Sequence, residues 1–247
     1  PYLAPAAKLG AKSLLVLPII WQNAVVGAVV LGFATSAILT DEERARARSL
    51  GDRVGVAFAT AAKDEQLYYQ ANYDALTTLP NRLYFKDQLA RRYAQAQREP
   101  QPFALLFIDL DNFKSVNDSL GHAAGDEVLR QTAERLKRCV RETDTVTRLG
   151  GDEFTIILAH LRAVRDPESV AEHVLRSLAA PFIIAGNEHF LSASIGIALY
   201  PEDGKSAEDL LRNADTAMYR AKEGGRGRFV YFEERMNVAA VARVNLD

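Results

Sequence analysis

The chain has 247 residues, of which 48% are apolar and 25% charged, and its formal net charge is −2. These values are typical of a soluble globular protein with one large or two modest domains, and they exclude intrinsic disorder, collagen-like repetition and a disulfide framework. The near-neutral charge offers no broad basic surface, so nucleic acid is not an expected partner. Cys139 is the only cysteine, and we expect a buried, unreactive thiol in a reducing compartment.

The longest apolar run, residues 24–34, is shorter than the roughly 20 residues that a membrane-spanning helix needs. The first residues lack the basic and then apolar segments of a signal peptide. We therefore expect a cytoplasmic protein with no membrane contact in this stretch. The chain starts with Pro1 in place of Met, and residues 233–247 have a helical pattern without a stop signal, so we expect a fragment of a longer protein.

Two segments rich in β-branched residues, 13–20 and 24–33, predict a β-hairpin with its turn at 22–23. A capping box at Thr40 and Glu43 then opens a helix that we expect to run to about Tyr73. Residues 1–40 and 41–73 are thus expected to form a hairpin region and a long signalling helix. The helix carries a short apolar seam at 4-3-4 spacing, which either pairs with a second copy or covers the hairpin; these interpretations are compatible, and neither is favoured. The seam residues are Leu50, Val54, Ala57 and Ala61.

Residues 74–232 predict one α/β unit. After residue 100 its elements follow the order βαββαββαβ, which is typical of an α+β fold with helices flanking a mostly antiparallel sheet. A helix is expected from about residue 83, and the later segments are a strand at 103–111, a helix at about 125–141, two strands within 146–158, a helix at 167–179, strands at 181–186 and 189–200, a helix capped by Ser206, and a strand at 228–232.

Two acidic pairs stand at the ends of expected strands. Asp109 and Asp111 end the first core strand on one face, where they either bind a cation or mark the point at which the strand reaches solvent. Asp152 and Glu153 follow the Gly150–Gly151 turn, which a hairpin alone would also explain. If this hairpin lies beside the first strand, Asp109 and Asp152 converge on a hard cation such as Mg²⁺, and the glycines let a phosphate approach the backbone.

The segment between the pairs offers groups for a purine nucleotide. The Asp126 carboxylate can accept both donors on the Watson–Crick edge of guanine, or it is an acid in the first turn of a helix. His122 is either a ligand contact or a loop histidine packed on its own turn. Lys222 and Arg226 flank a glycine turn and suit the β- and γ-phosphates, or they complement the C-terminus of a helix. Together these residues indicate a site for Mg²⁺ and a purine triphosphate.

Four stretches in the same order and spacing resemble GGDEF-type diguanylate cyclases: DALTTLPNR (74–82), DLDNFKSVNDSLGHAAGD (109–126), RLGGDEF (148–154) and ADTAMYRAKEGGRGR (214–228). The resemblance implies a fold similar to nucleotide cyclases and polymerase palms. It also implies that two GTP molecules are condensed to cyclic di-GMP, with release of two pyrophosphates, in a two-fold homodimer. Two positions depart from the family pattern: Thr78 stands where Gly is frequent, and Gly227 where Asn is frequent.

The same resemblance implies the roles of individual residues. Asp109, Asp152 and the Leu110 carbonyl would bind Mg²⁺ or Mn²⁺ with Glu153 close by, and Asp152 would also assist deprotonation of the 3′-hydroxyl. Lys114 would stabilise charge on the phosphates, so the catalytic set is Asp152, Glu153 and Lys114. The substrate contacts would be Lys114, Asn117, His122, Asp126, Lys222 and Arg226, of which Asn117 and Asp126 read guanine.

Three further resemblances concern regulation and neighbouring domains. Arg141 and Asp144 stand at the position of the family's product-inhibition site, although an exposed ion pair would have the same spacing. Residues 13–66 resemble the last strands and final helix of a GAF sensory domain. Residues 233–247 resemble the linker helix that precedes an EAL phosphodiesterase domain.

We therefore expect a bacterial signalling enzyme, a diguanylate cyclase. The first alternative is a GTP-binding, non-catalytic GGDEF module that regulates an adjacent EAL domain. The second is an interaction protein that dimerises through the long helix, which would leave the four motifs unexplained.

Overall fold

The computed structural model describes residues 10–21, 24–35, 40–161 and 166–236, and it divides into two compact units between Tyr69 and Gln70. Within the described ranges, no helix is both long and apolar enough to cross a membrane. The predicted linker helix at 233–247 lies almost wholly outside them.

The first unit confirms the predicted hairpin and helix. Strands β1 (Ser13–Trp21) and β2 (Ala24–Phe33) pair antiparallel. Helix α2 (Asp41–Asn72) begins at the predicted capping box, in which the Glu43 N–H donates to the Thr40 hydroxyl while the Thr40 N–H donates to the Glu43 carboxylate. This reciprocal pairing satisfies two of the amides that a helix start leaves free.

The hairpin packs against the glycine face of α2, next to the predicted seam. Gly51 and Gly55 are the buried residues of α2, and a Cβ on Gly51 would lie 3.6 Å from Cβ of Leu17. In the seam only Val54 is half-buried, whereas Leu50 is 44% exposed and the two alanines are also exposed. The glycine face of α2 therefore covers the hairpin, and most residues of the seam are exposed to solvent in this chain.

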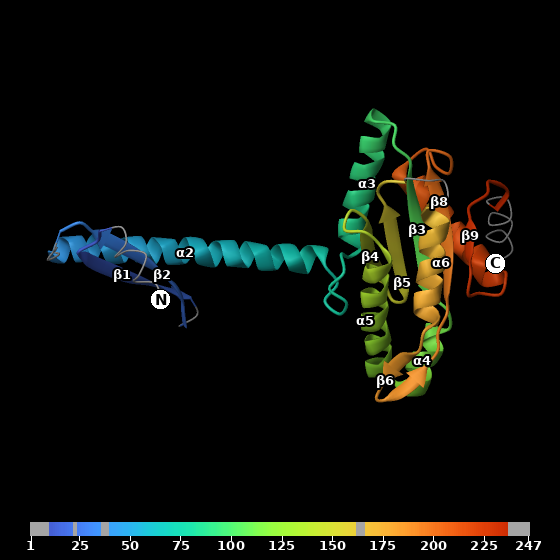
Figure 1. Ribbon diagram of the computed structural model, residues 1–247, viewed down its shortest axis with the longest axis horizontal. Helices are drawn as coiled ribbons and strands as arrows, with labels where there is room; N and C mark the ends of the chain where they lie inside the picture. The colour runs from blue at the N-terminus through green and yellow to red at the C-terminus, as the bar shows by residue number, and fades with distance from the viewer. Residues whose placement is uncertain (1–9, 22–23, 36–39, 162–165, 237–247) are drawn as a thin grey trace, which may run out of the picture. The chain divides into compact units, whose positions relative to one another are not determined.

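The second unit is built on a five-stranded sheet of order β4-β5-β3-β8-β9, in which only the β8–β9 pair is parallel. This confirms the predicted α+β class (Figure 1). Its elements are α3 (Arg82–Arg98), β3 (Phe103–Leu110), α4 (Phe113–Leu120), α5 (His122–Cys139), β4 (Thr145–Gly150), β5 (Glu153–Leu158), α6 (Asp166–Ala179), β6 (Phe182–Ile184), β7 (Asn187–His189), β8 (Ala193–Tyr200), α7 (Ala207–Glu223) and β9 (Phe229–Tyr231).

Two segments differ from the sequence-based expectation. Helix α4 occupies a stretch in which we expected no helix or strand, and its Ser, Asn and Asp residues have low helix preference. The strand expected at 189–200 starts only at Ala193, as β8 of the main sheet, and the short strand β7 before it pairs with β6 in a small separate sheet. Residues 190–192 lie between β7 and β8.

Strand β3 is buried along its whole length because helices cover both faces of the sheet. Phe103, Leu105 and Phe107 belong to the cluster with α3 and α7, while the alternating residues, including Leu106 and Ile108, pack with α5 and α6. Alternation therefore directs the next side chain of the first series, Asp109, toward the α3–α7 side of the sheet. The buried Cys139 thiol, whose pKa burial raises, fills the opposite layer as predicted.

Candidate active site

The central contact of the site joins β3 to the end of α7. Lys222 Nζ lies 2.8 Å from Asp109 Oδ2, and the Asp109 side chain is only 8% exposed. Helix α7 starts where the Ser206 hydroxyl accepts a hydrogen bond from the Asp209 N–H, and its last turn carries Lys222 to the carboxyl end of β3. Lys222 therefore does more than complement the C-terminus of α7, because it pairs with a specific buried carboxylate.

The β4–β5 turn lies next to Asp109, as the sequence predicted. Asp109 and Glu153 are directly opposite each other in the β3–β5 ladder, and the Leu110 N–H donates to the Asp152 carbonyl at 3.3 Å. Gly151 has φ +53°, a conformation that glycine adopts without strain, and a Cβ there would meet nothing within 4 Å. The backbone of the turn is therefore open to a ligand.

The electrostatics of the site favour a cation. Burial raises the pKa of Asp109 to about 6; the hydrogen bond from Lys222 opposes this shift, and the charge of Asp152 adds to it. Burial also raises the pKa of Glu153, although Arg82 opposes that change. The carboxylates thus carry more negative charge than Lys222 by itself balances.

These residues fit Mg²⁺. Among the described residues, no three His, Cys, Asp or Glu side chains converge as a self-sufficient metal cage. Mg²⁺ needs no such cage, because it usually binds one or two carboxylates and completes its shell with water and substrate phosphates. Asp109, Asp152 and the Leu110 carbonyl supply oxygen ligands of this kind.

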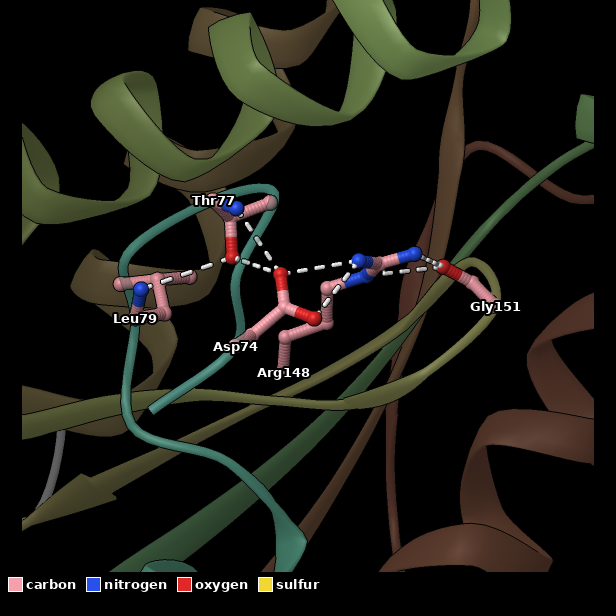
Figure 2. A network of polar contacts seen from close by, with 5 residues as sticks. All are labelled: Asp74, Thr77, Leu79, Arg148 and Gly151. Carbon is pink, nitrogen blue, oxygen red and sulfur yellow. Dashed lines mark hydrogen bonds and ion pairs between the residues drawn. The ribbon is translucent and has the colours of Figure 1, made fainter. Parts of the chain in front are cut away.

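Figure 2 shows how the turn is fastened to the segment that follows α2. The Arg148 guanidinium donates to both Asp74 carboxylate oxygens and, through Nε and Nη2, to the Gly151 carbonyl at 3.0 and 2.8 Å. Asp74 also accepts hydrogen bonds from the N–H and hydroxyl of Thr77. Burial by itself raises the pKa of Asp74, but these hydrogen bonds outweigh it and hold the pKa below its usual range.

A second arginine, which the sequence did not single out, contacts the same turn. Arg82 Nε donates to the Leu149 carbonyl at 3.2 Å, and its Nη2 lies 3.4 Å from Glu153 Oε2. Arg82 is the first residue of α3, whose N-cap, Asn81, also donates to the Ala71 carbonyl in the last turn of α2. No local sequence pattern predicts that an arginine at the start of a helix contacts a carboxylate 71 residues later, so the sequence could not identify this contact.

The two residues expected to read guanine lie close together. A Cβ on Gly125 would stand 2.0 Å from Asn117 Oδ1, so the Asn117 side chain of α4 lies directly over the residue before Asp126 in α5. Helix α5 begins at His122, so Asp126 is neither its cap nor in its first turn. The alternative that Asp126 is simply an acid of the first helical turn is therefore wrong. Both side chains are half-buried.

The other candidate substrate contacts are exposed. His122 is exposed at the start of α5 and is therefore not packed on its own turn, and Lys114 is exposed on α4. Arg226 is exposed in the α7–β9 loop with φ +62°, and Gly227 follows with φ +59°. Because Gly and Asn both tolerate this left-handed conformation, the departure at Gly227 has a simple backbone explanation.

Asp111, the second acid of the first pair, has hydrogen-bond partners that differ from those of Asp109. It is 3% exposed, and hydroxyls of Ser192 and Ser194 donate to its two oxygens at 2.6 and 2.7 Å. The Gly227 N–H also donates to it, at 3.1 Å. The strand has therefore not reached solvent here, and both Asp111 oxygens accept hydrogen bonds from other parts of the domain.

At the candidate regulatory position, Asp144 binds backbone amides of its own domain. Its carboxylate accepts the N–H groups of Arg141 and Ala159, at 3.1 Å each. In the part of the chain that the structure describes, no side-chain ion pair joins Arg141 to Asp144, and the exposed Arg141 borders two hollows. One hollow is also lined by His160 and His173. The simple ion-pair interpretation is therefore wrong, while a regulatory role stays a prediction.

The domain has an α+β fold with carboxylates at the end of its central strand, as we expected for a fold similar to nucleotide cyclases and polymerase palms. The family model described as "Diguanylate cyclase, GGDEF domain" matches residues 71–228. The chain belongs to this family, as the four motifs predicted.

Three curated proteins of Pseudomonas aeruginosa are similar to the chain. MucR, a bifunctional diguanylate cyclase/cyclic di-GMP phosphodiesterase, is 44% identical over 191 residues, which are 77% of this chain and 28% of MucR. The diguanylate cyclase TpbB is 45% identical over 166 residues, 67% of this chain and 38% of TpbB. NbdA, a cyclic di-GMP phosphodiesterase, is 30% identical over 228 residues, 92% of this chain and 29% of NbdA. The chain thus spans well under half the length of these relatives.

Solved structures agree with the fold. A truncated TpbB that comprises only the GGDEF domain has a TM-score of 0.66 and 42% identity, and the match covers 71% of this chain and 99% of that one. The coiled coil and GGDEF domain of DgcB from Caulobacter crescentus, in complex with c-di-GMP, has a TM-score of 0.67 and 28% identity, covering 74% of this chain and 97% of that one. The GAF-like and EAL-linker resemblances of the flanking segments stay predictions.

Proposed function

We propose that residues 74–232 form a diguanylate cyclase that condenses two GTP molecules into cyclic di-GMP and releases two pyrophosphates. The observation that carries this proposal is the buried Asp109 carboxylate, held by Lys222 and directly opposite Glu153 of the GGDEF turn. This arrangement is suited to a cation and a triphosphate at the end of the sheet. The similarity to TpbB and MucR supports the same activity.

In the proposed reaction, the 3′-oxygen of each GTP attacks the α-phosphorus of the other. Each attack forms a P–O bond, breaks the bond between the α-phosphorus and the bridging oxygen of pyrophosphate, and releases the proton of the 3′-hydroxyl. Asp152 is proposed to accept that proton. Phosphoryl transfer depends mainly on in-line placement and charge neutralisation. When bound at Asp109, Asp152, Glu153 and the Leu110 carbonyl, Mg²⁺ or Mn²⁺ supplies that neutralisation.

The remaining site residues are proposed to bind and orient GTP. Asn117 and Asp126 read the guanine edge, where the carboxylate accepts two donors that adenine does not present together. Basic side chains bind the phosphates, and His122 contributes a further substrate contact. The proposed phosphate contacts are Lys114, Lys222 and Arg226.

A two-fold product requires two sites that face each other, so we propose that the active species is a homodimer. The exposed part of the α2 seam, at Leu50, Ala57 and Ala61, is suited to this pairing. We further propose that cyclic di-GMP inhibits the enzyme by binding at Arg141 and Asp144. The N-terminal hairpin region would transmit a sensory signal through α2.

Incubation of the purified chain with GTP and Mg²⁺, followed by chromatography, tests the activity. We expect cyclic di-GMP from the wild type and at least a hundredfold less from Asp152→Asn, because the carboxylate serves both cation and proton. Glu134→Gln is the matched control, since Glu134 is exposed on α5 and 70% of its side chain is accessible. Formation of product by Asp152→Asn at the control rate would contradict the assignment.

The non-catalytic alternative keeps one observation in its favour, since MucR and NbdA carry phosphodiesterase activity in their names. A module of that kind would bind GTP tightly without forming product. Sedimentation analysis of the same sample separates the two cases, because absence of product from a dimeric, GTP-bound chain would favour the module.

A further inference from the structure

Asp111 is a buried carboxylate that the proposed reaction does not use. Its Oδ1 accepts the Ser194 hydroxyl, and its Oδ2 accepts both the Ser192 hydroxyl and the Gly227 N–H. The Asp111 N–H in turn donates to the Ser192 carbonyl at 2.9 Å. Burying a carboxylate is costly unless its acceptors are occupied, and here three donors from two other parts of the domain occupy them.

One of these donors belongs to the loop that carries the basic residues. Gly227 lies directly after Arg226, at a point where the backbone has φ values of +62° and +59° at two successive residues. The Arg226 N–H donates back to the Ala221 carbonyl at 3.1 Å. The loop therefore makes a tight, left-handed turn, and the Gly227 amide at its end is directed to Asp111.

Asp109 in β3 and Asp111, directly after β3, thus hold the two ends of one loop. Asp109 contacts Lys222 at the end of α7, and Asp111 contacts Gly227, so the six-residue span from Lys222 to Gly227 is fixed to two aspartates that are two residues apart in the sequence. Arg226 lies inside this span. With both ends fixed, the directions in which Lys222 and Arg226 leave the backbone are determined relative to the β4–β5 turn.

We propose that Asp111 is a positioning residue for the triphosphate: it holds the Lys222–Gly227 loop in the conformation that lets Lys222 and Arg226 reach the β- and γ-phosphates. This inference rests on the proposed function of that loop. Asp111 acts through the hydrogen bond to Gly227 and does not need its charge, because the charged groups that meet the nucleotide are the two basic side chains.

The hydrogen-bond geometry predicts which substitutions matter. In Asp111→Asn the amide oxygen can take the place of Oδ2 and accept from Ser192 and Gly227, while the Ser194 hydroxyl turns to accept from the amide nitrogen. Asp111→Ala removes the acceptor, and Asp111→Ser leaves an oxygen too close to the backbone to reach Gly227. Strand β9 stays attached in each variant, because the Ile195 N–H donates to the Arg228 carbonyl at 3.0 Å.

Isothermal calorimetry with Mg²⁺ and two ligands, 3′-deoxy-GTP and GMP, tests the proposal. The first keeps the triphosphate but cannot condense, since it lacks the attacking hydroxyl, and the second lacks the β- and γ-phosphates. We expect Asp111→Ala and Asp111→Ser to lose at least tenfold of the preference for the triphosphate while GMP affinity changes less than twofold. We expect Asp111→Asn to keep the wild-type preference within threefold, and Ser194→Ala, which leaves Gly227 bound, to do the same.

The outcomes separate a failure of the proposed phosphate site from a failure of the positioning role of Asp111. If the wild type shows no preference for the triphosphate, the proposed phosphate site fails, and the positioning role fails with it. If the wild type shows the preference and Asp111→Ser, folded by circular dichroism, keeps it, only the positioning role is overturned. Equal losses in Asp111→Asn and Asp111→Ser would overturn it as well, because they would show that the charge is what matters.

Discussion

Arg148 Nη1 donates to both carboxylate oxygens of Asp74, at 2.9 and 3.0 Å, across 74 positions of sequence (Figure 2). Asp74 stands two residues after the end of α2, and the same guanidinium holds the Gly151 carbonyl in the GGDEF turn. The segment that leaves the long helix is therefore connected to the proposed catalytic turn by a single side chain that is 11% exposed.

We expect Arg148→Lys to reduce the free energy of unfolding by about 2–3 kcal/mol, because an ammonium group cannot replace a planar fork that serves three acceptors, and the half-buried Asp74 carboxylate loses donors. Urea denaturation measures the loss. Arg176→Lys is the control, because that arginine is 70% exposed in its pair with Glu172 and should change stability by less than about 0.5 kcal/mol. Equal losses of unfolding free energy in the two variants would show that the Arg148 network stabilises the protein no more than an exposed ion pair does.

The raised pKa of Asp109 predicts a specific pH dependence in metal-free protein. Its folded pKa of about 6 lies above the value of about 3.9 for an unfolded chain, so the folded protein binds this proton more tightly. The contribution of Asp109 to the free energy of unfolding should then fall by about 2–3 kcal/mol as the pH rises from about 4 to 6. In the presence of EDTA, denaturation of the wild type and of Asp87→Asn, an exposed control, should show a decrease over this range that is larger by about this amount than the decrease in Asp109→Asn.

Arg141→Ala should raise the concentration of cyclic di-GMP needed for half-inhibition by at least tenfold and leave the uninhibited rate unchanged. Arg141 is a cleaner probe than Asp144, whose carboxylate also caps two backbone amides and whose removal should cost stability. Arg138→Ala, an exposed change one helical turn earlier, is the control. Unchanged inhibition in Arg141→Ala would refute the regulatory site.

Thr78→Gly should stabilise the protein by about 1 kcal/mol. Thr78 has φ +57°, a region that a β-branched residue occupies only at a cost, and this relief exceeds the entropy that glycine adds to the unfolded chain. The neighbouring Ala75 is exposed and lies outside that region, so Ala75→Gly should be neutral or destabilising. Thermal unfolding of both variants compares them directly, and a lower melting temperature for Thr78→Gly would contradict the strain argument.

Local patterns predicted most of the fold. The β-branched runs, the capping boxes at Thr40 and Ser206 and the glycine turn at 150–151 are short-range signals, and the structure confirms each of them. Helix α4 was missed because its residues have weak intrinsic helix preference, and its packing on α5 outweighs that preference. The same packing places Asn117 over Gly125, which no local pattern reveals.

The sequence by itself determined the family and the candidate residues, since four ordered motifs identify the GGDEF domain and residue types limit the chemistry to carboxylates, amides and cations. Only the tertiary structure decided the partners of these residues. Asp109 and Asp111 are equivalent in the strand pattern, yet one meets Lys222 and the other meets two serines and Gly227. Hydrogen bonds act over about 3 Å in space regardless of sequence separation. Which partners each aspartate contacts therefore depends on how β8 and α7 pack beside β3.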